Sequence, residues 1–256
     1  MITGGARLDE IAANLAAVEE RIVAACAAAG RARDEVTIVA VTKTFPASDV
    51  AHLRALGLRD VGENRHQDAA PKVAECAQAG LVDLRWHFVG QLQTNKAGAV
   101  VAYADVVHSV DRSRLVGALD RGAAVAGRVV TVLVQVDLDQ DPHNCMITTE
   151  KGAEKQAGAG GGRGGARPAD VLDLAGVVDA AASLELGGVM AVAPPTGDPA
   201  EAFARLAVIA NEVRSAYPRA GIVSAGMSGD LEAAIRHGAT HLRVGTALLG
   251  SRPLLG

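Results

Sequence analysis

The feature that most constrains the fold is a repeated alternation between short apolar or β-branched runs and helix-forming stretches. Eight runs have the length and residue types of strands. They lie at residues 37–43, 58–64, 85–90, 105–110, 129–138, 185–192, 221–227 and 241–249. Such alternation predicts a parallel sheet with right-handed crossovers, and eight strand–helix units close naturally into a barrel. We therefore expect an α/β fold in which residues 1–256 form a single (β/α)8 barrel of the TIM type, with an open doubly wound sheet as the alternative.

An additional helix is expected before the first strand. Across residues 8–29, apolar side chains recur at spacings of three and four, which is typical of an amphipathic helix. These side chains belong to Leu8, Ile11, Leu15, Val18, Ile22 and Cys26. Gly30 follows directly, where a helix C-cap favours glycine.

Length and composition agree with a barrel and exclude several classes of protein. The chain has 256 residues, close to the typical size of such barrels, and 49% of them are apolar but only 2% aromatic. Its core must therefore come from Ala, Val, Leu and Ile. A net charge of −4 with no basic stripe argues against nucleic acid as a partner. The N-terminus lacks the layout of a signal peptide, and no apolar stretch is long enough to cross a bilayer, so we expect a cytoplasmic protein without membrane contact.

The cysteines and one glycine-rich segment also carry expectations. Cys26, Cys76 and Cys145 are odd in number, widely spaced and free of any C-x-x-C pair, so the sequence indicates neither a disulfide framework nor a metal site. Cys26 is expected to be buried in the leading helix. Residues 151–169 are dense in glycine and have little to bury, which predicts a flexible loop between the fifth and sixth strands.

Lys43 is the first candidate for chemistry, because it ends the apolar run of the first strand. Barrel active sites lie at the carboxyl ends of the strands. A partly desolvated lysine has a lowered pKa, and its neutral amine is then available for Schiff-base formation. A strand-end lysine that extends to water is the alternative, and position alone leaves both interpretations open.

The second and third strands also end in polar residues. The second closes with Gly62-Glu63-Asn64, where the amide of Asn64 could bind a ligand oxygen or simply form a turn. The third brings Trp86 and His87 to the same edge. A histidine beside aromatic residues is more often structural than catalytic, so His87 stays a weaker candidate.

Two turns after the seventh and eighth strands suit a phosphate. Ser228 lies at the start of a predicted helix, and Gly245-Thr246 combine close backbone approach with a hydroxyl donor. Simple helix capping by Ser228 and an ordinary turn at Gly245 are the alternatives. Together with Lys43, however, these turns match what a phosphorylated aldehyde cofactor needs, namely a covalent tether and a phosphate anchor.

Arg243 restricts the chemistry that such a cofactor could support. Strand alternation directs its guanidinium towards the cofactor's pyridine ring. An arginine keeps its proton, so it disfavours protonation of the pyridine nitrogen and weakens the ring as an electron sink.

These segments together resemble one protein family over most of the chain. The residues that carry the resemblance are VAVTKTFP, GENRHQDAAPK, WHFVGQLQTNK, HSVDR, GGVMAVAPP, SAGMSGDLEAAI and RVGTALLG. In this combination and order they are similar to the pyridoxal phosphate homeostasis protein family. The sequence departs from the family after VDLDQDP, where residues 143–170 replace a shorter stretch, so the resemblance leaves the conformation of residues 140–169 open.

The resemblance implies a barrel like the N-terminal domain of bacterial alanine racemase, with one bound pyridoxal 5′-phosphate. It also implies a role for each matched position. Lys43 would form the Schiff base, Asn64 would lie near the ring, Arg243 would face the pyridine nitrogen, Ser228, Gly245 and Thr246 would hold the phosphate, and Met190 and His87 would line the pocket.

Three functions are compatible with these residues. The favoured one is a non-enzymatic carrier that binds pyridoxal phosphate, maintains its supply and passes it to apo-enzymes, as a monomer or weak dimer. The second is an amino-acid racemase. Alanine-type racemases add a C-terminal β-domain, whereas this chain ends soon after the eighth strand. Racemisation also requires a second acid–base group, for which neither Tyr103 nor Tyr217 is well placed, whereas His87 stays open as an alternative. An interaction module with a structural Lys43 is the third and least favoured.

Overall fold

Eight parallel strands close into a barrel in chain order, which confirms the predicted fold and rejects the open sheet. The computed structural model describes residues 3–139 and 164–251. The strands are β1 Thr37–Val41, β2 Asp60–Glu63, β3 Arg85–Phe88, β4 Val106–Val110, β5 Val130–Gln135, β6 Leu184–Met190, β7 Ile222–Ser224 and β8 His241–Val244. Closure is made by β8, which pairs in parallel with β1 through Thr37 opposite His241 and Val39 opposite Arg243.

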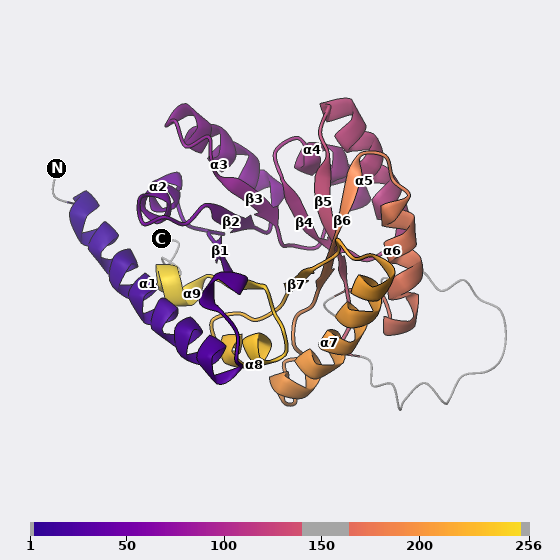
Figure 1. The fold of residues 1–256 in the computed structure, drawn as a ribbon. Coiled ribbons are helices and arrows are strands. Elements are labelled where there is room, and N and C mark those ends of the chain that lie inside the picture. Colours follow the sequence, from indigo (N-terminus) through magenta and orange to yellow (C-terminus); the bar gives the residue numbers. More distant parts are fainter. Residues whose placement is uncertain (1–2, 140–163, 252–256) are drawn as a thin grey trace.

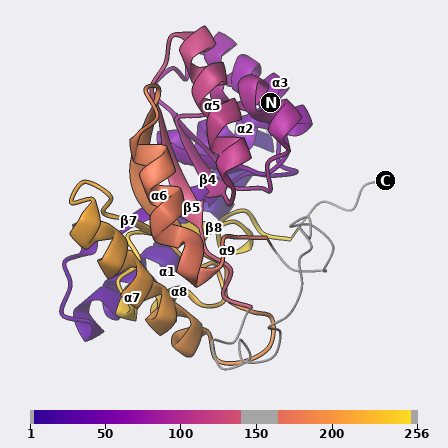
Figure 2. The ribbon, with the colours of Figure 1, turned by 90° about the vertical axis from the view of Figure 1, so that its right-hand side faces the viewer.

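Helices surround this barrel (Figure 1). They are α1 Thr3–Ala28, α2 Ala47–Ala55, α3 His66–Gln78, α4 Ala97–Val101, α5 Ser113–Ala126, α6 Val171–Asp179, α7 Pro199–Ala216, α8 Leu231–Arg236 and α9 Thr246–Leu249. Helices α5, α6 and α7 follow one another along one flank, as Figure 2 shows from the side. None of the helices described is both long and apolar enough to cross a membrane.

The N-terminal helix α1 was expected and packs against α8 and α9. It begins five residues earlier than predicted, at Thr3, and ends at Ala28. Gly30 has a left-handed φ of 66°, and the N–H of Arg31 donates to the carbonyl of Cys26 at 2.9 Å. This pattern is a Schellman motif, which explains why a glycine ends the helix.

The strand predicted over residues 241–249 is wrong in its second half. Strand β8 ends at Val244, and Thr246–Leu249 form the short helix α9 instead. A short apolar run does not distinguish strand from helix by pattern alone. Leu248 and Leu249 are buried, and Asn14 and Arg7 of α1 donate side-chain hydrogen bonds to their carbonyls.

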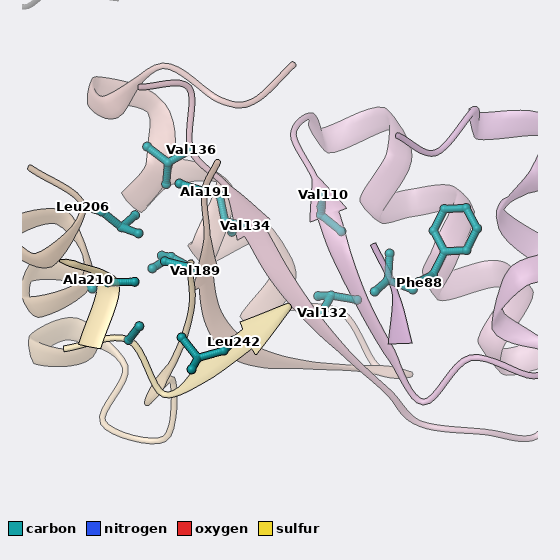
Figure 3. Close-up of a cluster of buried hydrophobic side chains, with 14 of the residues drawn as sticks. Phe88, Val110, Val132, Val134, Val136, Val189, Ala191, Leu206, Ala210 and Leu242 are labelled. Atoms are coloured by element: carbon teal, nitrogen blue, oxygen red, sulfur yellow. The ribbon is translucent and has the colours of Figure 1, made fainter. Parts of the chain in front are cut away.

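The main core lies between the outer face of the barrel and the helices. Valine and leucine side chains on the strands meet apolar side chains of the surrounding helices, at about 1.5–3 kcal/mol for each fully buried side chain. Figure 3 shows part of this layer, with Val110, Val132, Val134, Val189 and Leu242 from the barrel and Leu206 and Ala210 from α7. The barrel interior is different, because it holds the buried polar residues His87, His108, Ser224 and Arg243 as well as apolar ones.

The predicted flexible loop at residues 151–169 falls mostly outside the described residues. The described part of this segment, residues 164–169, pairs with the barrel. Ala166 is buried and forms a parallel bridge with Val136, and its N–H donates to the carbonyl of Gln135 at 2.7 Å. Cys26 and Cys76 are free and buried, as expected for Cys26, whereas Cys145 lies outside the described residues. Within the described ranges, no cluster of His, Cys, Asp and Glu could hold a metal ion.

Candidate functional site

The residues singled out from the sequence gather at one end of the barrel. Lys43 lies two residues after β1, Asn64 directly after β2, and Met190 at the last position of β6. Gly245 and Thr246 follow β8. Because the strands are all parallel, these positions share the carboxyl end, where barrel proteins carry their active sites.

Strands β1 and β8 bring the lysine next to the glycine turn. Val39 is paired with Arg243, so Val41 lies beside Gly245 two residues further along. A Cβ added to Gly245 would lie only 3.2 Å from the carbonyl oxygen of Val41. The backbones therefore approach closely at this point, and Lys43 leaves β1 beside the start of α9.

Lys43 occupies a tight, strained turn. The N–H of Phe45 donates to the carbonyl of Thr42 at 3.0 Å, which leaves Lys43 and Thr44 at the turn's two central positions. Thr44 has a left-handed φ of 72°, a conformation that costs a non-glycine residue about 1–2 kcal/mol. Such strain persists only where the surroundings hold the backbone in place, and it concentrates at functional sites. Lys43 itself is partly buried and has no hydrogen bond or ion pair to any described residue.

A buried ion pair holds the residue that precedes this lysine. The Thr42 hydroxyl donates to Glu63 Oε1 at 2.7 Å, and Lys72 Nζ donates to the Thr42 carbonyl at 2.8 Å and to Glu63 Oε1. Glu63 is 1% exposed and Lys72 8%. Sequence reasoning missed both residues, although an acidic residue in a buried strand followed nine positions later by a lysine was the available signal. They fix the backbone from which Lys43 projects.

The two turns expected to suit a phosphate are in direct contact. The hydroxyl of Ser228 accepts a hydrogen bond of 3.2 Å from the N–H of Ala247, in the first turn of α9. Ser228 does not cap α8, which begins at Leu231 after Asp230. The Ser228 hydroxyl therefore lies next to the first turn of α9, which Gly245 and Thr246 begin.

Arg243 is buried within the barrel at 6% exposure. Its Nη1 donates to the Ser224 hydroxyl at 2.7 Å and its Nη2 to the carbonyl of Ala191 at 2.8 Å. Burial lowers the pKa of the guanidinium to about 10, against the opposing effect of Asp230. Arg243 is therefore a cation at neutral pH, fixed between the carboxyl ends of β6 and β7.

His87 lies below Arg243, inside the barrel. Its Nε2 is 2.8 Å from Asp60 Oδ1, and its Nδ1 is 2.8 Å from Nε2 of His108. The other nitrogen of His108 is 3.0 Å from the Ser224 hydroxyl. Both ring nitrogens of His87 are thus already bonded within the protein, and sequence reasoning did not single out His108, Ser224 or Asp60. Their available signal was a polar residue at an inward-facing position of a buried strand.

The remaining candidates lie as follows. Met190 is buried and packs with Val106 and Leu133 inside the barrel. Tyr103 follows α4, where its ring stacks on His66 at 5.9 Å, and Tyr217 caps the C-terminus of α7. Neither tyrosine is at the carboxyl end of a strand, in agreement with the sequence interpretation.

Comparison with known sequences gives full-length relatives. A pyridoxal phosphate homeostasis protein of Mycobacterium tuberculosis is 43% identical over 261 residues, covering 97% of this chain and 95% of the relative. The protein of the same description from Escherichia coli is 33% identical and covers 96% of this chain and 98% of its own length. Residues 155–253 also match the family described as the alanine racemase N-terminal domain.

Solved structures agree with these relatives. PipY of Synechococcus elongatus, solved with pyridoxal phosphate bound, is 31% identical with a TM-score of 0.73, covering 94% of this chain and all of PipY. Alanine racemase of Corynebacterium glutamicum shares the fold at 14% identity and a TM-score of 0.66, with 97% of this chain matched to 63% of the racemase. The chain belongs to the pyridoxal phosphate homeostasis protein family.

Proposed function

We propose that this chain binds pyridoxal 5′-phosphate at the carboxyl end of the barrel, with Lys43 as the Schiff-base residue. The observation that carries the proposal is the position of Lys43, which leaves β1 beside the Gly245-Thr246 turn of β8. When bound, the cofactor supplies an aldehyde that condenses reversibly with an amine. The family and the cofactor-bound PipY support the same ligand.

The residues present fit each part of this cofactor. The Ser228 and Thr246 hydroxyls and the backbone at Gly245 are suited to the phosphate, because they offer donors where no side chain obstructs the approach. A guanidinium has five N–H donors, and Arg243 uses two of them in hydrogen bonds to Ser224 and Ala191. The remaining donors are available for the pyridine nitrogen. Asn64, directly after β2, is placed to contact the ring.

Met190 and His87 take supporting places in this proposal. Met190 is buried opposite Ser224 in the β6–β7 register, at the floor of the proposed site. Both ring nitrogens of His87 are already hydrogen-bonded, to His108 and to Asp60, so His87 influences the cofactor only through His108.

The proposed role is reversible storage and delivery of the cofactor to apo-enzymes, without a dedicated reaction. The cationic Arg243 favours an unprotonated pyridine nitrogen, which weakens the ring as an electron sink. Racemisation also needs an acid and a base on opposite faces of the substrate, and neither Tyr103 nor Tyr217 lies at the carboxyl end of a strand.

Borohydride trapping tests the binding site. The purified protein is mixed with pyridoxal phosphate, reduced and digested, and the modified lysine is identified by mass spectrometry. We expect a near-visible absorbance band and one adduct on Lys43, both lost in Lys43→Ala and retained in Lys96→Ala, a matched change at another partly buried lysine. Absence of a band from the wild-type protein overturns the binding proposal, and an adduct that persists in Lys43→Ala overturns the assignment of Lys43.

Delivery is tested separately from binding. The cofactor-loaded protein is incubated with an apo-enzyme that needs pyridoxal phosphate, and in parallel with single L-amino acids. We expect the apo-enzyme to gain activity and the amino acids to keep their chirality. Racemisation at ordinary enzymatic rates, with no gain of apo-enzyme activity, contradicts the carrier role and supports a racemase.

A further inference from the structure

A continuous line of hydrogen bonds crosses the barrel interior from Arg243 to Asp60. It runs from Arg243 through Ser224, His108 and His87, with contacts of 2.7, 3.0, 2.8 and 2.8 Å. Asp60 begins β2, at the amino end of the barrel, whereas Ser224 and Arg243 are near the carboxyl ends of β7 and β8. The line therefore connects the proposed cofactor site with the opposite edge of the barrel.

The two ends fix the direction of every bond between them. A guanidinium can only donate and an ionised carboxylate can only accept. Ser224 must then accept from Arg243 and give its single hydroxyl proton to Nδ1 of His108. His108 must carry its proton on Nε2 and donate to Nδ1 of His87, which in turn carries its proton on Nε2 and donates to Asp60. Each group has one proton for one bond, so a single arrangement satisfies the whole line.

Burial supports this arrangement. His108 is fully buried and His87 is 1% exposed, so water does not compete for their nitrogens. Burial is also the largest influence on both histidines, and it lowers their pKa values, which keeps the rings neutral with one proton each. For Asp60, burial raises the pKa, whereas the hydrogen bond from His87 and the charge of Arg85 lower it; the net shift of the pKa is downward, so the carboxyl is ionised.

The line also answers a problem of charge. Among the described residues no carboxylate lies within ion-pair distance of Arg243, whose two hydrogen-bond partners are neutral, and Asp230 acts on the guanidinium only by its charge, without a hydrogen bond to it. An unpaired buried charge is costly. Three neutral groups with their acceptor atoms towards Arg243 and their donor atoms towards Asp60 stabilise both charges, because their dipoles are aligned between them.

We propose that Asp60, His87, His108 and Ser224 form a one-directional relay that positions Arg243, with Asp60 as its remote counter-charge. The four are positioning residues, because they act on the cofactor only through Arg243. The arrangement of protons in the relay does not depend on the proposed function. The effect of the relay on the cofactor's ring nitrogen does depend on the proposed function.

Nitrogen NMR of the cofactor-free protein tests the relay directly. Long-range proton–nitrogen spectra distinguish the two neutral tautomers of histidine, and His87→Gln and His108→Gln assign the signals. We expect both rings to be neutral with the proton on Nε2 at pH 7. A proton on Nδ1 of either ring, or a charged ring, overturns the relay, and the tautomers themselves are read from the wild-type protein.

Asp60→Asn then tests transmission. An amide can donate as well as accept, so Asp60→Asn also permits the reverse arrangement, in which both rings carry the proton on Nδ1 and Ser224 accepts from both Arg243 and His108. Because Arg243 still favours the original direction, we expect the two rings to change together, with any Nδ1–H signal at His87 matched by one at His108, which does not touch residue 60. The matched control is Glu185→Gln, another carboxylate at the amino end of the strands that is outside the relay and should leave both rings unchanged. A change at His87 alone contradicts transmission.

The effect on the cofactor is read from its spectrum. Bound pyridoxal phosphate should show a shifted absorbance maximum in Asp60→Asn but not in Glu185→Gln. If the tautomers change and the spectrum does not, the positioning of Arg243 by Asp60 is overturned while the relay stands. If no variant or wild-type protein binds the cofactor at all, the proposed function fails, and the cofactor-free spectra still decide the relay.

Discussion

At the scale of single residues, the buried pair of Glu63 and Lys72 gives a sharp prediction. Lys72→Met removes the ammonium group from a carboxylate that is 1% exposed and whose Oε2 has no hydrogen-bond partner among the described residues. Breaking a buried pair on one side costs about 3–5 kcal/mol. We expect a loss of this size in the free energy of unfolding, measured by urea denaturation, and slower adduct formation at Lys43, because Thr42 loses its anchor.

The paired change separates charge from packing. Glu63→Gln combined with Lys72→Met leaves no unpaired charge, so most of the lost stability should return. Lys96→Met serves as a control outside this cluster and should change stability little. A loss below about 1 kcal/mol in Lys72→Met would show that water reaches Glu63 and that the pair does not hold the turn.

Single residues also show where sequence reasoning stops. Lys43 was predicted because an apolar strand pattern ends at it, which is a local signal. His87 was placed on the right strand, but its partners are His108 and Asp60, and His108 in turn contacts Ser224, which lies 116 positions further along the chain. Spacing in sequence does not reveal which inward-facing side chains meet inside a closed barrel.

At the scale of elements, all eight strands were predicted, but seven of their eight carboxyl ends were placed one to five residues too late, the exception being that of β4. The strands predicted to end at residues 43, 227 and 249 end at Val41, Ser224 and Val244 in the structure. The ends are set by close approaches between neighbours. A Cβ on Gly90, for example, would lie 2.1 Å from the carbonyl oxygen of Asn64, so the segments after β2 and β3 can meet only over a glycine. Such contacts depend on tertiary register, which local propensity does not contain.

At the scale of the whole molecule, barrel closure followed from the count and order of elements, but the polar interior did not. That interior predicts how stability depends on pH. The pKa values of His87, His108 and His241 are lowered, in each case most strongly by burial, and that of His241 is lowered to about 4. In the unfolded chain a histidine titrates near a pKa of about 6.5.

The sign of the dependence follows from proton binding. Below about pH 6.5 the histidines bind protons in the unfolded chain but not in the folded interior, so the free energy of unfolding falls as the pH decreases. Each such proton contributes a slope of about 1.4 kcal/mol per pH unit. Asp60, with its lowered pKa, adds to the loss only at lower pH, once its carboxylate begins to be protonated in the unfolded chain below about pH 4.

Urea denaturation between pH 7.5 and about pH 4.5 measures this slope. We expect the free energy of unfolding to be constant near neutral pH and to fall more and more steeply below about pH 6.5. In His241→Asn the slope should be smaller by the contribution of up to one proton. His237→Asn, a change at a histidine that ends α8 outside the barrel interior, is the matched control. A free energy of unfolding that stays constant down to pH 5 would mean that water or a rearranged interior accommodates the charged histidine rings. That result would also contradict the relay, which requires His87 and His108 to be neutral.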